Sequence, residues 1–379
     1  MPVPEPSFSV GVEEEYLLVD CRSRDLTPDP PPSMLRECQA RCADPEQVTP
    51  EFLRSQIEVG TRVCGTVSEA RADLARLRAT ICEVAAQHGL APIAASTHPF
   101  ARWTEQRRTE RDRYSALADE LQGTARRMLI CGMHVHVGIE DEELRIDLMS
   151  QLSYFLPHLL ALSCSSPFFE GEDTGLNSYR LTIFDALPRT GLPEQFASWA
   201  EYARHVKVLV RAGVMEDASK IWWDLRPSAR FPTLETRIMD VCTRLDDAES
   251  LAALVISTLR MLWRLRNGNQ RWRVYTPMLV NENRWRAMRY SFDAGMIDLG
   301  QGRVITFAEA LDDLIALIEP DARVLGCAEA VLRSREILSR GASAHRQRAV
   351  FAEARAAGAD HREALAAVVD WLIETTAKV

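Results

Sequence analysis

The sequence predicts an α+β protein built on one large sheet. Strand-like segments alternate with long segments of helical period over much of the chain, and only helical segments follow from Thr306 onward. Several strand-like segments also alternate polar with apolar residues, which predicts a sheet with one polar face and one face packed on helices. We expect a single domain over residues 1–379, with the helical segment 306–379 packed on it.

The first half of the chain is expected to contain strands at residues 8–20, 52–63, 90–97 and 128–139. A helix is expected at 68–89, because Ser68 can cap its first turn and apolar residues recur at helical spacing. A second helix over 142–165 is expected to bend near Pro157, since proline removes a backbone donor.

The second half is expected to begin with a helix at 194–212 and two extended segments at 222–227 and 233–241. A long apolar helix follows, capped by Asp246 or Asp247 and ending near Arg266. Thr306 and Glu309 fit a capping box, and a last helix is expected at 361–376.

The composition is that of a globular chain, with 46% hydrophobic and 26% charged residues. The formal net charge of −9 argues against nucleic acid or an anionic membrane as a partner, because such binders have a basic surplus. Nine scattered cysteines without a C-x-x-C pair indicate reduced thiols. With neither a signal peptide nor an apolar run of about 18 residues, we expect a cytoplasmic protein.

The segment Gly11-Val-Glu-Glu-Glu-Tyr16 has the strongest local pattern. Alternation along a strand places Glu13 and Glu15 on one face, about 7 Å apart, and Glu14 on the other. Two carboxylates that share a buried face need cations between or beside them. Carboxylate oxygens suit Mg²⁺ or Mn²⁺. The alternative is a solvated acidic face on an edge strand.

A second pattern, Gly132-Met-His-Val-His-Val-Gly138, places His134 and His136 on one face of an apolar strand. Two buried histidines must be satisfied by a metal, a phosphate or a carboxylate. Satisfied core histidines remain an alternative, and so does a zinc hydrolase, although the sequence lacks H-E-x-x-H.

Three further segments place charged or polar residues on one strand face. Glu235 and Arg237 form either a surface pair or a metal ligand beside a phosphate clamp. The others pair Gln56 with Glu58, and align Lys220, Trp222, Asp224 and Arg226.

Together, these strands predict a face that gathers carboxylates, two histidines and basic residues, which is typical of a metal–nucleotide site. The carboxylates would hold metal ions, and Arg and Lys would neutralise a transferred phosphoryl group. The sequence has no G-x-x-x-x-G-K-[ST] loop, and no G-x-G-x-x-G follows a strand. A P-loop enzyme is excluded and a dinucleotide-binding fold is unsupported.

The sequence resembles the second type of bacterial glutamate–cysteine ligase, also called the carboxylate–amine ligases, over about residues 8–350. His98-Pro-Phe and Arg113-Tyr114 fit this family. The main matching segments are Gly11–Asp20 (GVEEEYLLVD), Gly132–Gly138 (GMHVHVG), Ser166–Arg180 (SPFFEGEDTGLNSYR) and Trp222–Asp240 (WWDLRPSARFPTLETRIMD).

The resemblance implies a glutamine-synthetase-like catalytic fold, in which a curved, mostly antiparallel sheet forms a funnel backed by helices. It implies an ATP-dependent ligase that joins a carboxylate, expected to be the γ-carboxylate of L-glutamate, to an amine or amino acid through an acyl phosphate. The implied metal ligands for Mg²⁺ or Mn²⁺ are Glu13, Glu15, Glu58, His134 and Glu235. The implied phosphate and substrate contacts are His136, Lys220, Arg237, Arg226 and Arg180. We further expect a homo-oligomer, a dimer.

Two alternatives keep the nucleotide but change the function. A phosphotransferase of the guanidino-kinase type would phosphorylate one substrate without joining two molecules. A catalytically inactive relative would bind nucleotide without turnover. The chain also departs from the family pattern at Glu172, where relatives often have a basic residue. If that position contacts a substrate carboxylate, a basic acceptor is favoured.

Overall fold

The computed structural model describes residues 4–379, without the side chains of Arg113 and Ala116. The match of Arg113 to the family pattern therefore lies outside the described side chains. The centre is a seven-stranded sheet in the order β10-β11-β5-β1-β3-β2, with β4 also paired to β1, and every ladder in it is antiparallel. Its strands are β1 (Val10–Asp20), β2 (Val48–Pro50), β3 (Gln56–Gly60), β4 (Leu90–Ile93), β5 (Met133–Gly138), β10 (Leu225–Pro227) and β11 (Thr233–Thr236).

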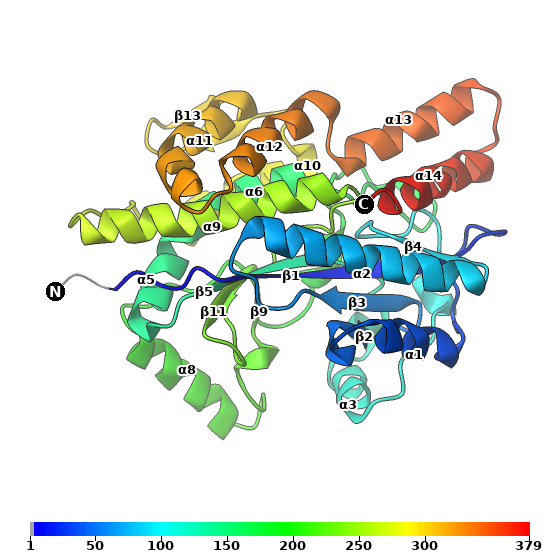
Figure 1. The fold of residues 1–379 in the computed structure, drawn as a ribbon, viewed down its shortest axis with the longest axis horizontal. Coiled ribbons are helices and arrows are strands. Elements are labelled where there is room, and N and C mark those ends of the chain that lie inside the picture. The colour runs from blue at the N-terminus through cyan, green and yellow to red at the C-terminus, as the bar shows by residue number, and fades with distance from the viewer. Residues whose placement is uncertain (1–3) are drawn as a thin grey trace.

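Helices lie on both sides of this sheet (Figure 1). Two long ones, α2 (Val67–Gln87) and α9 (Leu245–Asn267), contact β1 and bury its apolar face. In the view of Figure 1, α9, α11 and α12 lie above the sheet, while α8, α1 and α3 lie below it. The other helices are α1 (Pro32–Arg41), α3 (Asp112–Leu121), α4 (Gly123–Arg126), α5 (Glu142–Leu152), α6 (Leu156–Ser163), α7 (Arg180–Phe184), α8 (Trp199–Arg211), α10 (Pro277–Tyr290), α11 (Phe307–Val324), α12 (Ala328–Arg340), α13 (Ser343–Ala356) and α14 (His361–Thr376).

Three short ladders lie outside the main sheet. They pair β6 (Phe168–Phe169) with β7 (Glu172–Asp173), β8 (Thr190–Gly191) with β9 (Trp222–Trp223), and β12 (Met296–Asp298) with β13 (Arg303–Ile305). The mixture of helices with an antiparallel sheet confirms the predicted α+β class. All nine cysteines are free thiols, as expected.

The predicted helix boundaries are partly confirmed. The capping box of Thr306 and Glu309 is present, and the last helix covers His361–Thr376 as predicted. The cap at Ser68 is wrong, because α2 begins at Val67 and Thr66 accepts the hydrogen bond from the amide of Glu69.

Other helical predictions need correction for local reasons. The segment 142–165 is divided into α5 and α6, with Pro157 in the first turn of α6, where its missing amide costs nothing. Asp246 and Asp247 lie inside the first turn of α9 and pair with arginines instead of capping it. Helices α1, α3 and α10 were not predicted, since their apolar faces are short.

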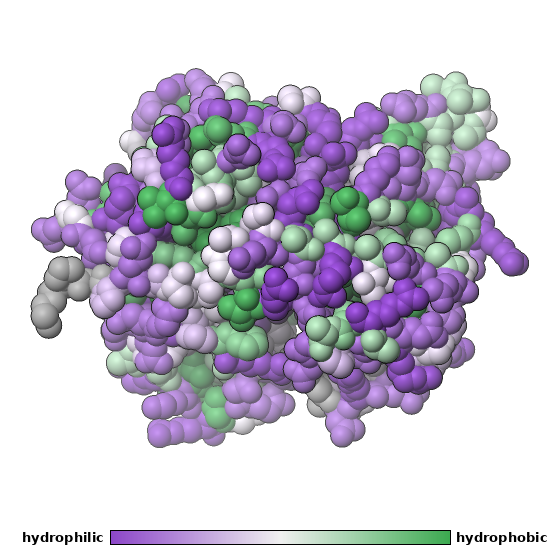
Figure 2. Space-filling model, in the orientation of Figure 1, coloured by the Kyte–Doolittle hydropathy of each residue, from purple (hydrophilic) through white to green (hydrophobic). Residues whose placement is uncertain are grey.

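No helix in the described part of the chain combines the length and the apolarity needed to cross a membrane. Most of the face drawn in Figure 2 is hydrophilic, with hydrophobic residues in small separate groups.

A buried ion pair joins β1 to α2 behind the sheet. The carboxylate of Glu14 lies 2.6 Å from a guanidinium nitrogen of Arg78, and both side chains are fully buried. Arg78 also donates to the carbonyl oxygens of Cys242 and Thr243, at 2.7 and 3.0 Å, and Tyr16 donates to Glu14. This network connects β1, α2 and the chain that follows β11.

We expect Arg78→Met to lower the free energy of unfolding by about 3–5 kcal/mol, because it leaves the Glu14 carboxylate buried without a cation. Urea denaturation followed by circular dichroism would measure the change. Arg323→Met is the matched control, since its pair with Glu319 is exposed and its loss should cost below about 0.5 kcal/mol. Equal effects of the two substitutions would contradict the structural role of Arg78.

Candidate active site

The register of the antiparallel strands brings the predicted polar residues together on one face of the sheet. Because residues directly opposite each other in neighbouring strands project to the same side, each pair in the register becomes a pair of neighbours. The aligned pairs are Glu13 with His134, Glu15 with Glu58, Glu235 with His136, and Glu235 with Arg226.

This face borders a cavity of about 1300 Å³. Every residue predicted for the site lines it: Glu13, Glu15, Glu58, His134, His136, Arg180, Lys220, Arg226, Glu235 and Arg237. The cavity therefore contains the complete set of side chains that the sequence assigned to metal, phosphate and substrate.

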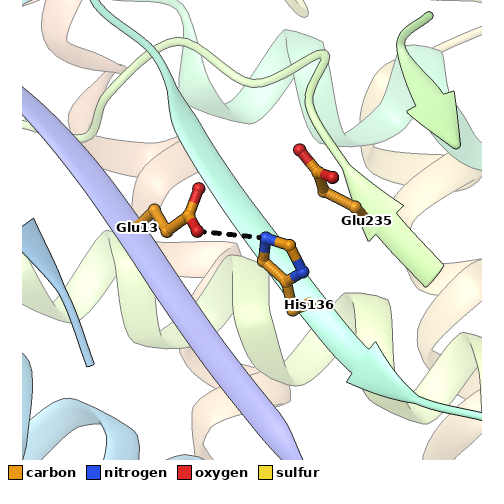
Figure 3. A group of neighbouring side chains, drawn as sticks. All are labelled: Glu13, His136 and Glu235. Atoms are coloured by element: carbon orange, nitrogen blue, oxygen red, sulfur yellow. Dashed lines mark ion pairs between the residues drawn. The ribbon is translucent and has the colours of Figure 1, made fainter. Parts of the chain in front are cut away.

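Glu13, His136 and Glu235 form a group of candidate metal ligands, with ligand atoms that all lie within 4.8 Å of one another (Figure 3). The three side chains come from the neighbouring strands β1, β5 and β11. One carboxylate oxygen of Glu13 lies 3.0 Å from Nδ1 of His134, and the other lies 3.3 Å from Nε2 of His136. The geometry thus adds His136, which the sequence assigned to ATP phosphates, to the candidate ligands. The role of His134 as a ligand stays a prediction.

Two arginines hold Glu235. Arg226 donates to both carboxylate oxygens, at 2.9 and 3.1 Å, and Arg237 forms a further ion pair with it. Burial alone would raise the pKa of Glu235, but the charges of Arg237 and Arg226 outweigh it and hold the pKa well below its usual range. Glu235 is therefore an anion at neutral pH.

The two histidines differ in their protonation. Burial, assisted by the charge of Arg237, lowers the pKa of His134 to about 4, so the ring is neutral at physiological pH. Burial also acts to lower the pKa of His136, yet the hydrogen bond and charge of Glu13 outweigh it, and this pKa is raised. Nε2 of His134 is buried and has no hydrogen-bond partner among the described residues. A neutral imidazole with an unsatisfied nitrogen is suited to hold a metal ion.

Toward β3, the row of carboxylates that begins with Glu235 and Glu13 continues with Glu15, Glu58 and Glu51. There, no positive charge outweighs the effect of burial on the pKa. Burial raises the pKa of Glu58 well above its usual range, and the nearby charges of Glu51 and Glu13 raise it further. Burial also raises the pKa of Glu51 and of Glu15, although Arg180 partly offsets the effect on Glu15. Among the described side chains, no Lys or Arg forms an ion pair with Glu51 or Glu58. Half-buried carboxylates that repel each other fit a divalent cation, and they are part of the donor set predicted for Mg²⁺ or Mn²⁺.

Glu51 was not predicted from the sequence. It directly follows the three-residue strand β2 and Pro50, so no alternating pattern marks its orientation. Its carboxylate faces the cavity beside that of Glu58. In the sequence it lies one residue before the strand expected at 52–63 and therefore outside the alternating pattern.

Arg180 lies at the floor of the cavity and is buried. Its guanidinium donates to the carbonyl oxygens of Ile238 and Arg237, at 3.3 and 3.2 Å. It passes so close to Gly132 that a Cβ atom there would lie 2.4 Å from Nη2, so any other residue at this position would displace the guanidinium. The amide of Gly132 in turn donates to Glu15 at 2.8 Å. Gly132 therefore positions both an arginine and a carboxylate.

Lys220 lines a different wall. Its ammonium lies 3.4 Å from Glu216 and 3.9 Å from Glu120, and no ion pair between it and the central carboxylates occurs in the described residues. Its assignment to phosphate stays a prediction. Glu172 lies on the exposed strand β7 and is not among the residues that line the cavity. This position gives no support to a contact between Glu172 and a substrate carboxylate.

A comparison with models of protein families identifies the family to which this chain belongs. A model of glutamate–cysteine ligase family 2 matches residues 9–370. The chain belongs to this family. A relative from Rhodospirillum rubrum, named "Putative glutamate–cysteine ligase 2", is 60% identical over 374 residues, which cover 98% of this chain and 96% of that protein. A relative of the same name from Paracoccus denitrificans is 57% identical over 370 residues, which cover 98% of each chain.

Solved structures show the same fold at much lower identity. The glutamate–cysteine ligase of Francisella tularensis in complex with AMP has a TM-score of 0.69 and 12% identity, covering 100% of this chain and 91% of that one. A bifunctional glutathione synthetase from Pasteurella multocida also has a TM-score of 0.69, with 14% identity and coverage of 97% and 52%. Family membership confirms the prediction of an ATP-dependent carboxylate–amine ligase, and these structures confirm the predicted fold.

The raised pKa of Glu58 predicts that metal affinity increases with pH, because a bound cation must displace the proton from this carboxyl. Isothermal titration with Mn²⁺ between roughly pH 6 and pH 8 should show affinity rising by up to about tenfold per pH unit for each proton displaced. Glu58→Gln should weaken binding and flatten this dependence. Glu172→Gln, on the exposed strand β7, is the control and should retain the slope. A pH-independent affinity in the unaltered protein would contradict the assignment.

Proposed function

We propose that this protein joins the γ-carboxylate of L-glutamate to an amine through an acyl phosphate formed from ATP. The observation that supports the proposal best is the arrangement around Glu235, where two arginines adjoin the candidate metal ligands Glu13 and His136. Phosphoryl transfer requires cations beside a phosphate group, and this arrangement can provide both kinds. The family name and the AMP complex of the Francisella protein support the same chemistry.

In this proposal Mg²⁺ or Mn²⁺ binds at one or more positions along the carboxylate row and, when bound, neutralises phosphate charge. The ligands are Glu13, Glu15, Glu58, Glu235 and His134, as predicted from the sequence, together with His136 and Glu51, which the geometry adds. The carboxylates supply hard oxygen donors and the neutral imidazole supplies nitrogen.

The two arginines beside Glu235 take different roles. All of the nitrogens of Arg226 are used in contacts, because it donates to Glu235 and to the carbonyl oxygens of Ser219 and Ile221. Arg226 therefore positions Glu235. Nε of Arg237 is buried and has no partner in the described part of the chain, so this guanidinium has a hydrogen bond left to donate to a phosphate oxygen. Lys220 would add a further phosphate contact, and Arg180 would hold a substrate carboxylate.

The reaction has two steps. A glutamate carboxylate oxygen attacks the γ-phosphorus of ATP, the bond to the β,γ-bridging oxygen breaks, and ADP leaves. The amine nitrogen, after losing a proton, then attacks the carbonyl carbon of the acyl phosphate, and inorganic phosphate leaves. Negative charge develops in both steps where Arg237 lies, so the same guanidinium stabilises each transition state.

Amine-dependent release of ADP tests the proposal. ATP, Mg²⁺ and L-glutamate are combined with a panel of amino acids and amines, and products are identified by mass spectrometry. The expected product has the summed mass of glutamate and amine less one water. Exchange of ¹⁸O from the β,γ-bridge of ATP, dependent on glutamate alone, would support the acyl phosphate. A phosphorylated product formed from one substrate would instead identify a phosphotransferase.

Substitutions of two candidate metal ligands provide a second test. Glu235→Ala and Glu13→Ala are each expected to lower ADP release at least about 100-fold, because they remove a metal ligand and, in the first case, the partner of two arginines. Circular dichroism should show an unchanged fold. Glu172→Ala is the matched control and should retain the activity of the unaltered protein. Retention of full activity by either central variant would refute the site.

Three further expectations accompany this function. We propose a homodimer, a cytoplasmic location, and one catalytic domain in which segment 306–379 packs on the rest. Helix α14 contacts β4 and helices α11 and α12 contact α9, which supports the single domain.

A further inference from the structure

A small hydrophobic cluster borders the cavity apart from the main core. Its buried members come from β6, from α7 and the residues that follow it, and from the chain just before β5, and they include Ile130, Phe184 and Leu187. Leu121, Met128 and Trp222 pack against it and are half-buried. Hydrophobic side chains that pack on one side and remain partly exposed on the other present an apolar surface to whatever occupies the space beside them.

The side of this cluster that faces the cavity, together with Leu117 of α3, forms what we name the apolar wall. It consists of Leu117, Leu121, Met128, Phe184, Leu187 and Trp222. Leu117 and Leu121 lie one helical turn apart on α3 and therefore share a face. One turn earlier, Tyr114 donates to the carbonyl oxygen of Pro50 at 2.9 Å and packs edge-to-face on Phe52. These contacts hold α3 in place with its two leucines toward the cavity.

The apolar wall adjoins the end of the cavity at which Glu15 and Glu58 lie. Gln56, which shares a strand face with Glu58, donates to the carbonyl oxygen of Ile130 at 2.7 Å. The guanidinium of Arg180, beside Glu15, lies 5.4 Å from the ring centre of Phe184. A molecule whose reacting atom is near Glu15 can therefore extend along this wall.

The three substrates differ in whether they have an apolar group that could contact the wall. Glutamate and the phosphates of ATP are charged and require the cationic and metal-binding groups. Adenine has another aromatic surface available, because the half-exposed ring of Phe231 lies edge-on to His136 at the opposite end of the cavity. The amine is the remaining substrate.

We propose that the amine substrate bears a branched aliphatic or aromatic group that binds against the apolar wall. This inference rests on the proposed ligase function and specifies its acceptor. A side chain as small as that of cysteine or alanine would leave most of the wall uncovered, whereas a leucine- or phenylalanine-sized group would remove it from water.

Acceptor competition tests the inference with the full-length protein. At saturating ATP, Mg²⁺ and L-glutamate, kcat/KM is measured for L-alanine, L-cysteine, L-leucine, L-phenylalanine and phenethylamine. The best of the three bulky amines is expected to exceed both alanine and cysteine by at least about 10-fold. Turnover with alanine or cysteine that equals or exceeds that of every bulky amine would overturn the inference and leave the ligase intact. Absence of amine-dependent ADP release with the whole panel would overturn the proposed function and this inference with it.

Truncation of the wall supplies the second measurement. Leu121→Ala and Leu117→Ala are each expected to lower the ratio of kcat/KM for the bulky amine over alanine by about 10-fold. Two separate variants keep the test decisive if one fails to fold, as judged by circular dichroism. Leu279→Ala is the matched control, since this leucine lies on α10, is 39% exposed and does not line the cavity. An increase in the KM for ATP, with the amine ratio unchanged, would assign the wall to the nucleotide and overturn the inference.

Discussion

Strand β1 has three consecutive glutamates, and the way their charges are compensated constrains the whole site. Glu14 faces the helices and is neutralised by the fully buried Arg78, while Glu13 and Glu15 face the cavity. A shift of one residue in the register would send Glu13 and Glu15 into the apolar core and Glu14 into the cavity, away from its arginine. The ion pair behind the sheet thus selects the register that assembles the carboxylates in front of it.

The electrostatics of the cavity are uneven along its length. At the β11 end, Arg226 and Arg237 exceed the single carboxylate that they hold, so a phosphate group finds a cationic surface. At the β3 end, burial raises the pKa of both Glu51 and Glu58, and the charge of Glu51 raises that of Glu58 further; a divalent cation would relieve that repulsion. His134 and Glu13 lie between the two regions. A metal-bound nucleotide is complementary to both, because it presents cationic metal and anionic phosphate together.

The fold class and most of the site could be predicted because strand alternation determines orientation one strand at a time. Glu13, Glu15, His134, His136 and Glu235 all lie on the predicted face. The distances between strands could not be predicted, since register depends on pairing partners that are distant in sequence. For that reason the grouping of His136 with Glu13 and Glu235 emerged only from the structure.

Glu51 and the apolar wall were missed for related reasons. Glu51 follows a strand too short to show a pattern, and α3 presents only two leucines one turn apart to the cavity. The family motif also left the place of Glu172 open, because a residue within a motif can lie on an exposed strand outside the cavity. Residues outside regular alternation therefore need the three-dimensional arrangement before a role can be assigned.

The apolar wall also bears on how the reaction avoids water. The acyl phosphate of the proposed reaction would be open to hydrolysis, and a cavity of about 1300 Å³ admits many water molecules unless substrates displace them. A bound metal and the arginines would exclude water around the phosphate, but they would do so less well around the carbonyl carbon that the amine attacks. An amine with an apolar group that covers Leu117, Leu121 and Trp222 would displace water from that side while it delivers its nitrogen. Recognition of the acceptor and protection of the intermediate would then depend on the same surface, and a small polar amine would lose both.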